Sequence, residues 1–260
     1  MDKIRFRDQL DRDVLIKRKP KRIISIVPSI TELLYFLGFE DEVIAITKFC
    51  VHPQEWFETK ERIGGTKSLK IQNIIDLKPD LVIGNKEENT KEDIFLLEKK
   101  VPVWMSDISS FDDSLDFIKR LGSVLNKEAL CNDLVRTLNS AFERLKDLGK
   151  KRTAIYFIWN NPAYIAGSGT FISGMLEQIG FINACKDSRY PDTDKSPILN
   201  PEFVFLSSEP YPFEEKHRRY YQQCYPNAKI LLVDGEMFSW YGSRMLKAID
   251  YFEEKFRNIE

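Results

Sequence analysis

The sequence has no long apolar run and contains few of the residue types that mark common chemical functions. Only two histidines and four cysteines occur in 260 residues, and no C-x-x-C pair is present, so a zinc or redox centre has no support. The 39 basic and 40 acidic side chains nearly cancel, which argues against a nucleic-acid-binding protein. The four cysteines are widely scattered, which favours free thiols over structural disulfides, although two disulfides stay an alternative in an oxidising compartment.

The amino-terminal residues are charged throughout and lack the apolar segment of an export signal. No stretch is apolar enough to suggest a transmembrane helix. We therefore expect a cytoplasmic protein as the sequence stands, and a periplasmic one if an export signal was removed.

Short β-branched runs alternate with helical patterns in the first 110 residues. Apolar runs predict strands at 23–27, 42–47, 81–84 and 101–105. Between the first two, Ser29 and Glu32 have the spacing of a capping box, and Gly38 is a typical helix end. Strands that alternate with helices in this way predict a parallel sheet with crossover helices.

Residues 111–149 have no proline and carry leucines and other apolar residues at helical spacing. We expect one long helix here, with an interruption at 122–126 as the alternative, and its length suits a brace between two lobes. The α/β alternation then restarts, with expected strands at 153–159, 203–208 and 229–234 and helices after Thr170 and over 243–256. The sequence thus predicts an α/β protein with an amino-terminal lobe (1–110), a linking helix (111–149) and a carboxy-terminal lobe (150–260).

Open parallel sheets bind ligands beyond the carboxyl ends of their strands. The segments that follow the expected strands are rich in aromatic, hydroxyl and turn-forming residues, as a small-molecule site requires. The segment 235–244, GEMFSWYGSR, clusters Phe238, Trp240 and Tyr241. Such a cluster is costly to leave in water, so it either contacts a ligand or packs against the neighbouring lobe.

No catalytic constellation can be assembled from this sequence. His52 with Cys50 gives only C-x-H, too few ligands for a metal site, and His217 lies in the charged run EEKHRRYY, which favours an exposed helix face. The G-S-G-T at 167–170 has the spacing of neither a P-loop nor a dinucleotide fingerprint, so a turn before a capped helix is expected. We expect a protein that is not an enzyme and has no cofactor or metal of its own.

Several segments together resemble the helical-backbone family of periplasmic receptors, over roughly residues 20–258. They include RIISIVPSITELLYFLG, IGGTKSLKIQNIIDLKPDLVIG, NNPAYIAGSGT, KDSRYP and VDGEMFSWYGSR. Members of this family bind cobalamin, haem, ferric siderophores or metal ions, and the cobalamin receptors are the most similar. The resemblance implies two Rossmann-like lobes joined by one long helix, a ligand cleft between the lobes, and delivery of a corrinoid or other chelated metal to an ABC importer.

The resemblance also implies a set of ligand-contacting residues. They are Pro28, Ser29, Phe49, Cys50, Tyr164, Tyr190, Glu236, Phe238, Trp240, Tyr241 and Arg244.

The sequence departs from the cobalamin receptors at three places. Thr66 stands where they have tryptophan, Gln72 stands at one of the two glutamates that dock onto the permease, and Asp194 is the nearest match to the other. An ABC permease is thus an expected partner, although neither docking position holds a glutamate: Gln72 stands at one, and Asp194 is a loose candidate for the other. We expect a monomer without nucleic-acid or membrane binding. The alternatives are a ferric-siderophore or haem receptor, an intracellular enzyme or carrier for such a ligand, and a regulatory module without a ligand.

Overall fold

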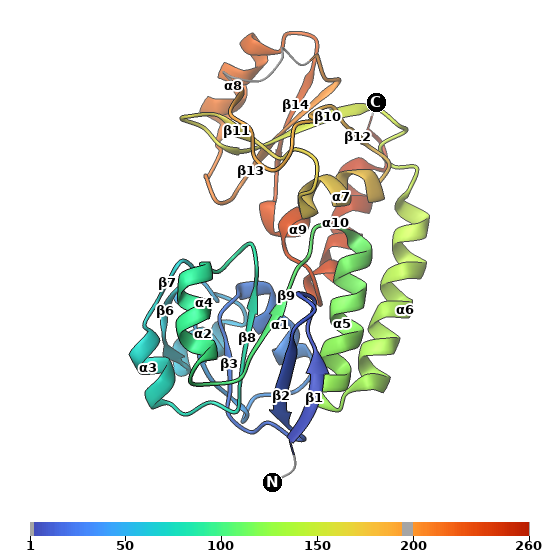
Figure 1. The fold of residues 1–260 in the computed structure, drawn as a ribbon. Coiled ribbons are helices and arrows are strands. Elements are labelled where there is room, and N and C mark those ends of the chain that lie inside the picture. The colour runs from blue at the N-terminus through green and yellow to red at the C-terminus, as the bar shows by residue number, and fades with distance from the viewer. Residues whose placement is uncertain (1–2, 194–199, 260) are drawn as a thin grey trace. The chain divides into compact units, whose positions relative to one another are not determined.

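The computed structural model describes residues 3–193 and 200–259, which form two compact units (Figure 1). Unit 1 comprises the chain up to residue 108 with residues 112–136 and 241–244, and unit 2 comprises residues 109–111, 137–240 and the chain from 245. The predicted lobe boundaries at residues 110 and 149 follow the ends of sequence elements, whereas these units follow contacts, so the boundaries stay a prediction. None of the helices in the described residues is long and apolar enough to cross a membrane.

Unit 1 contains a five-stranded parallel sheet with the strand order β5-β4-β3-β8-β9. Its strands are β3 (Ile23–Ser25), β4 (Val43–Ile46), β5 (Glu61–Arg62), β8 (Leu81–Asn85) and β9 (Val103–Ser106). Every residue of β3, β8 and β9 is buried, as expected for strands covered on both faces. The helices that join them are α1 (Pro28–Phe36), α2 (Gln54–Thr59), α3 (Ile71–Asp76) and α4 (Lys91–Glu98). The predicted parallel sheet is confirmed.

Two hairpins in unit 1 were not predicted. They are formed by β1 (Lys3–Arg7) with β2 (Asp13–Lys17), and by β6 (Gly64–Gly65) with β7 (Ser68–Leu69). The first is rich in charge, yet it buries Val14 and Ile16 on one face. The fully buried carboxylate of Asp8 accepts hydrogen bonds from the backbone amides of Leu10 and Arg12 and from the Arg12 guanidinium, which fixes the turn.

The predicted capping box at the start of α1 is wrong. The helix begins two residues earlier, at Pro28, with Val27 instead of Ser29 as the N-cap and no side-chain cap, because proline is well suited to the first helical position. Glu32 is consequently released from the cap, and its Oε2 lies 2.7 Å from Nε of Arg244. The predicted helix end is confirmed, since Gly38 has a φ of 75°.

The segment expected to be one long helix forms two, α5 (Phe111–Leu125) and α6 (Glu128–Leu145). Asn126, with a φ of 58°, ends the first, and the amide of Lys127 donates to the carbonyl of Gly122. The prediction of one uninterrupted helix is therefore wrong. The break falls at the end of residues 122–126, the stretch predicted as the alternative. The division between the units falls within α6, after Arg136.

Unit 2 contains a sheet with the order β11-β10-β13-β14, in which β12 also pairs with β10. Strands β10 (Thr153–Trp159), β12 (Ile182–Asn183), β13 (Phe203–Ser207) and β14 (Lys229–Val233) are parallel, and β11 (Tyr164–Ile165) is antiparallel. Its helices are α7 (Phe171–Gln178), α8 (Glu215–Cys224), α9 (Gly235–Ser239) and α10 (Arg244–Phe256). The Thr170 side chain caps α7, as predicted.

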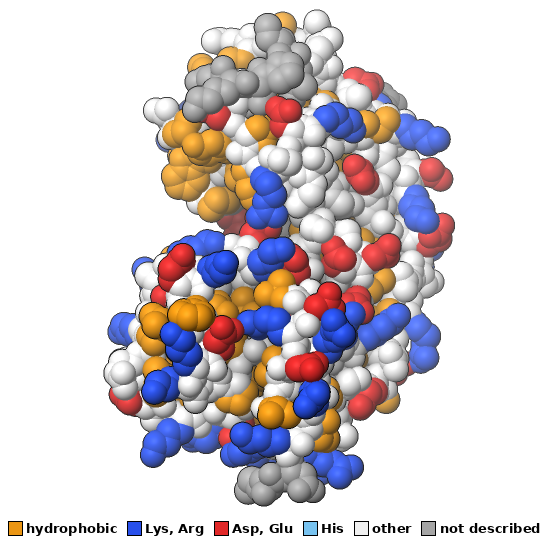
Figure 2. All heavy atoms as spheres, viewed as in Figure 1, with side chains coloured by type: hydrophobic (Ala, Val, Ile, Leu, Met, Phe, Trp, Pro, Cys, Tyr) orange, Lys and Arg blue, Asp and Glu red, His pale blue; other side chains and the backbone are white. Residues whose placement is uncertain are grey.

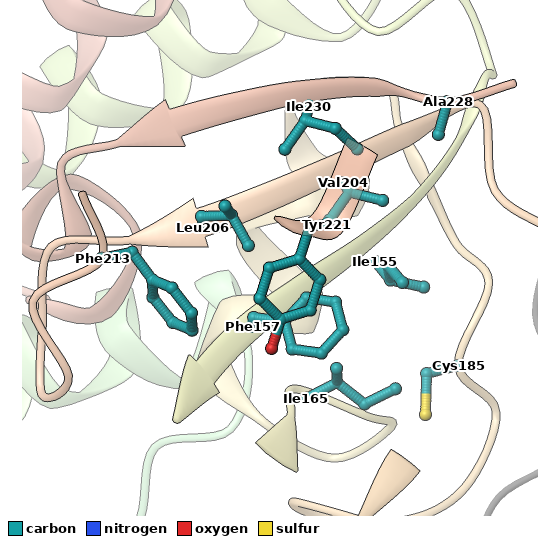
Figure 3. Packing of buried hydrophobic residues seen from close by; sticks show 10 residues of the cluster. All are labelled: Ile155, Phe157, Ile165, Cys185, Val204, Leu206, Phe213, Tyr221, Ala228 and Ile230. Carbon is teal, nitrogen blue, oxygen red and sulfur yellow. The ribbon is translucent and has the colours of Figure 1, made fainter. Parts of the chain in front are cut away.

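One face of this sheet forms an apolar core beneath α8 (Figure 3). The Tyr221 ring of α8 lies 4.5 Å from the ring of Phe157 in β10, surrounded by Val204, Leu206 and Ile230. The core also contains Cys185, and all four cysteines of the chain are free thiols, as predicted.

Candidate ligand-binding site

The carboxyl end of β4 in unit 1 presents an exposed aromatic ring, that of Phe49. Its side chain is 51% exposed, and Lys48 Nζ lies 5.0 Å from the ring centroid. The ring is placed against the turn of β6 and β7, because a Cβ at Gly65 would lie 3.0 Å from Phe49 Cε2. Pro28 is half-buried at the start of α1, and Ser29 is buried behind it. Of the residues predicted in this lobe, Phe49 thus offers the largest apolar surface.

Cys50 is buried within unit 1 and faces hydroxyl groups instead of solvent. The Oγ1 atoms of Thr31 and Thr47 each lie 3.1 Å from its Sγ. Burial raises the pKa of the thiol, so the group stays protonated and unreactive at neutral pH. The predicted ligand contact of Cys50 is therefore replaced by a structural role. The half-buried His52 nearby forms no metal site, since no cluster of three metal-binding side chains occurs among the described residues.

The carboxyl ends of β10 and β13 in unit 2 hold a second group of rings, which we call the aromatic surface of unit 2: Trp159, Tyr164 and Tyr211. Trp159 is the last residue of β10, is 40% exposed, and is the cross-strand partner of Tyr164 in β11. The ring centroids of Trp159 and Tyr211 are 5.7 Å apart. The pairing register of β10 with β11 shifts between Phe157 and Trp159, so the regular ladder is disrupted at the strand end that carries the tryptophan.

Sequence reasoning proposed Tyr164 but missed Trp159 and Tyr211. The run TAIYFIW predicts a strand, and no binding role was predicted for its last residue. The signal that could have found it is the position of Trp159 directly before the turn-forming pair Asn160 and Asn161, at the end where parallel sheets bind ligands.

A chain of hydrogen bonds fixes the Tyr211 ring. Asn160 accepts from the Tyr221 hydroxyl at 3.1 Å and donates to the Tyr211 hydroxyl at 3.3 Å. The Tyr211 oxygen also lies 3.0 Å from Nε2 of His217, whose Nδ1 accepts from the backbone amide of Glu214. His217 is therefore buried in a capping box, and its predicted place on an exposed charged face is wrong.

The glycine-rich stretch at 167–170 turns at Gly169, with a φ of 70°, directly before the capped helix α7, as expected, and it also allows close packing. A Cβ at Gly167 would lie 2.1 Å from the carbonyl oxygen of Asp187, so only glycine allows this close approach. The approach brings residues 187–192 beside β11, with a bridge between Tyr164 and Asp192. Tyr190 in this segment is half-buried beneath the guanidinium of Arg189, 5.8 Å from the ring centroid. Asp194, the loose match to one of the two positions expected to contact the permease, lies outside the described residues.

The aromatic residues of the final loop are divided between the two units. Helix α9 turns Phe238 into the core of unit 2, where its centroid is 5.1 Å from Tyr156 and 4.8 Å from Phe252. Trp240 is mostly buried in unit 2, whereas Tyr241 belongs to unit 1 and packs 5.6 Å from Phe117. Phe238, which has no exposed surface, thus packs in the core of unit 2 instead of contacting a ligand, and the ligand contacts of Trp240 and Tyr241 stay a prediction.

Glu209 holds the Trp240 side chain in place. Its Oε1 accepts from Trp240 Nε1 at 3.0 Å and from the Ser239 hydroxyl at 2.7 Å. Desolvation raises the pKa of Glu209 above its ordinary 4.5, and the nearby Glu236, itself half-buried, adds to the rise. The charged form is thus less stable in the folded protein than in the unfolded chain.

We expect Glu209→Gln to weaken the pH dependence of stability. A raised carboxyl pKa contributes stability that is complete below pH 4.5 and is lost as the pH rises through the native pKa of Glu209. Glutamine keeps an acceptor oxygen for Trp240 but carries no charge. Melting temperatures across this pH range should therefore fall less in Glu209→Gln than in the wild type. Identical slopes for the two proteins would contradict the buried charge.

Parallel sheets with exposed rings at the carboxyl ends of their strands are typical of α/β proteins that bind a small ligand. The model of the family described as periplasmic binding protein matches residues 23–210. The chain therefore belongs to the periplasmic binding protein family, and it is a receptor of the ABC-importer type rather than an enzyme.

Individual relatives agree with this assignment. The chain is 26% identical to the uncharacterized ABC transporter substrate-binding lipoprotein YvrC of Bacillus subtilis, over 95% of this chain and 83% of that protein. It is 31% identical to the vitamin B12-binding protein of Vibrio parahaemolyticus, over 72% of this chain and 70% of that protein. The petrobactin-binding protein YclQ of Bacillus subtilis has the same fold, with a TM-score of 0.82 and 14% sequence identity. The match covers 99% of this chain and 100% of that protein.

Proposed function

We propose that this protein is the receptor of an importer for a corrinoid such as vitamin B12. The observation that carries the proposal is the aromatic surface of unit 2, exposed at the strand ends of a chain whose relatives include vitamin B12-binding proteins. Rigid rings bury a large area against a ligand at little cost in conformational entropy, which suits a broad, partly apolar molecule.

The ligand would contact a separate surface on each unit. Unit 1 offers Phe49, with Pro28 and Ser29 at the start of α1, and unit 2 offers its aromatic surface with Tyr190. Thr66, buried beside the β6–β7 turn, adds no ring, so Phe49 supplies the apolar contact of unit 1. The buried Phe238 and Cys50 are left out of this site because neither side chain has exposed surface.

The receptor would work outside the cytoplasm with an ABC permease. The relatives' names support this compartment, since one is a lipoprotein and the family is described as periplasmic. The permease would not be contacted through a pair of glutamates, as in the cobalamin receptors. The exposed Gln72 of α3 is neutral, and its side chain donates a hydrogen bond to Asp76 at 2.8 Å.

We expect Trp159→Ala to weaken vitamin B12 binding by about 2 kcal/mol, or roughly thirtyfold, because the aromatic surface of unit 2 loses its largest ring. Tyr220→Ala is the matched control, since Tyr220 is a 58% exposed ring on α8 outside that surface. Its affinity should stay within about twofold of the wild type. Isothermal titration calorimetry measures both.

Gel filtration with vitamin B12, haem or a ferric siderophore tests the ligand class. Co-elution of vitamin B12 supports the proposal, and co-elution of haem or a ferric siderophore alone would transfer the site to that ligand. If none of the three co-elutes, the proposal is wrong. Equal losses in Trp159→Ala and Tyr220→Ala would place the ligand elsewhere.

A further inference from the structure

A cavity of about 510 Å³ lies in unit 1 at the amino ends of β8 and β9, whereas Phe49 follows the carboxyl end of β4. Its floor is apolar, with Ile75, Val101 and two prolines, and Leu15 of β2 lines it while staying 51% exposed. Four lysines surround this floor: Lys3, Lys17, Lys78 and Lys100. The cavity thus combines an apolar base with a ring of ammonium groups.

Two aspartates, Asp76 and Asp80, also line the cavity, so the four lysines leave it with an excess of positive charge rather than with positive charge alone. Lys17 pairs with Asp80, whose second oxygen accepts from the amide of Lys21. No ion pair within residues 3–193 and 200–259 involves Lys3, Lys78 or Lys100. These three lysines come from β1, the end of α3 and the loop after α4, so the fold gathers them from distant positions.

The positive surface extends beyond the cavity. Arg18 and Lys19 are exposed directly after Lys17, and Lys99 beside Lys100 lies 3.6 Å from the centroid of the half-exposed Phe95 ring. We call the residues Lys3, Lys17, Arg18, Lys19, Lys78 and Lys100 the basic pole. Figure 2 shows Lys and Arg side chains gathered along the lower edge, beside the amino-terminal end. The chain as a whole has a net charge of −1, so this pole is a local concentration of charge.

We propose that the basic pole binds the surface of an anionic phospholipid membrane. A free phosphate would need only the cavity, but Arg18 and Lys19 add exposed cations directly after Lys17, and the cavity also exposes the apolar side chain of Leu15. Phospholipid headgroups with acyl chains match this combination of cationic and apolar groups. The pole lies at the amino ends of the strands, so such contact would leave the Phe49 end of unit 1 open. The proposal does not depend on the identity of the imported ligand.

Two double variants of the full chain test the proposal. Lys78→Ala/Lys100→Ala removes charge at the carboxyl ends of α3 and α4, and Lys70→Ala/Lys91→Ala removes the same charge at the amino ends of the same helices. Sedimentation with vesicles of phosphatidylglycerol and phosphatidylcholine should show about 25-fold weaker binding for the first, about fivefold per lysine, and a change of under about threefold for the second. Binding of the wild type should also fall as salt is raised.

Three results would overturn the proposal. The first is wild-type binding that is no stronger to these vesicles than to pure phosphatidylcholine vesicles. The second is an equal loss in the two double variants, which would indicate a general charge effect. The third is displacement from the vesicles by low concentrations of inorganic phosphate, which would assign the cavity to free phosphate.

Discussion

Glu32→Ala is expected to lower the free energy of unfolding by about 3–5 kcal/mol, because it leaves the charge of Arg244 buried without its carboxylate. Nε of Arg244 lies 2.7 Å from Oε2 of Glu32, and the two side chains are only 4% and 11% exposed. Both residues belong to unit 1, although 212 positions separate them in sequence. Chemical denaturation monitored by circular dichroism measures the loss.

An exposed pair of the same charge type provides the control. Glu253 of α10 and Arg257, directly after the helix, form an i,i+4 ion pair with much greater exposure, so Arg257→Ala should cost less than about 1 kcal/mol. The double variant Glu32→Leu/Arg244→Met should recover most of the stability, since an apolar pair needs no charge compensation. A loss in Glu32→Ala no larger than that in Arg257→Ala would show that the pair is open to solvent.

The sheets could be predicted from the sequence because their signal is local. Residues 81–83 and 203–206 are uninterrupted apolar runs, and such runs have few alternatives in an α/β chain. Thr170 and Gly38 act through their immediate neighbours, so the cap and the helix end that they provide were also predictable. The charged β1–β2 hairpin was missed because its burial depends on alternate residues in a five-residue strand.

The side-chain positions in the candidate site could not be predicted, because they depend on contacts that the spacing of residues in the sequence does not reveal. Glu32 has the spacing of a capping residue, and only the return of the chain at Arg244 gives it another partner. Trp159 ends an apolar strand, yet its side chain is 40% exposed where the pairing register of β10 with β11 shifts. Phe238 resembles a loop residue until the short helix α9 turns it inward. In each case the deciding interaction joins segments that are distant in sequence or changes the direction of one side chain.

The assignment of Phe238 to the core leads to the second large expected effect. Phe238→Ala should lower the free energy of unfolding by about 3–5 kcal/mol, since the ring is fully buried against Tyr156, Phe205 and Phe252 and its removal leaves a cavity. Phe95→Ala is the control, because that ring is 53% exposed and its loss should cost under about 1 kcal/mol.

Comparison with Trp159→Ala separates a core role from a ligand contact. If Phe238 only stabilises the fold and does not contact the ligand, Phe238→Ala should keep near-wild-type affinity at temperatures where the variant is folded. Trp159→Ala should instead lose affinity and keep its stability. The opposite pattern, with Phe238→Ala as stable as the wild type and weak in binding, would mean that α9 turns outward when the ligand is bound. Because the two rings lie in one unit and differ in exposure, 0% against 40%, these two measurements decide which of them faces the ligand.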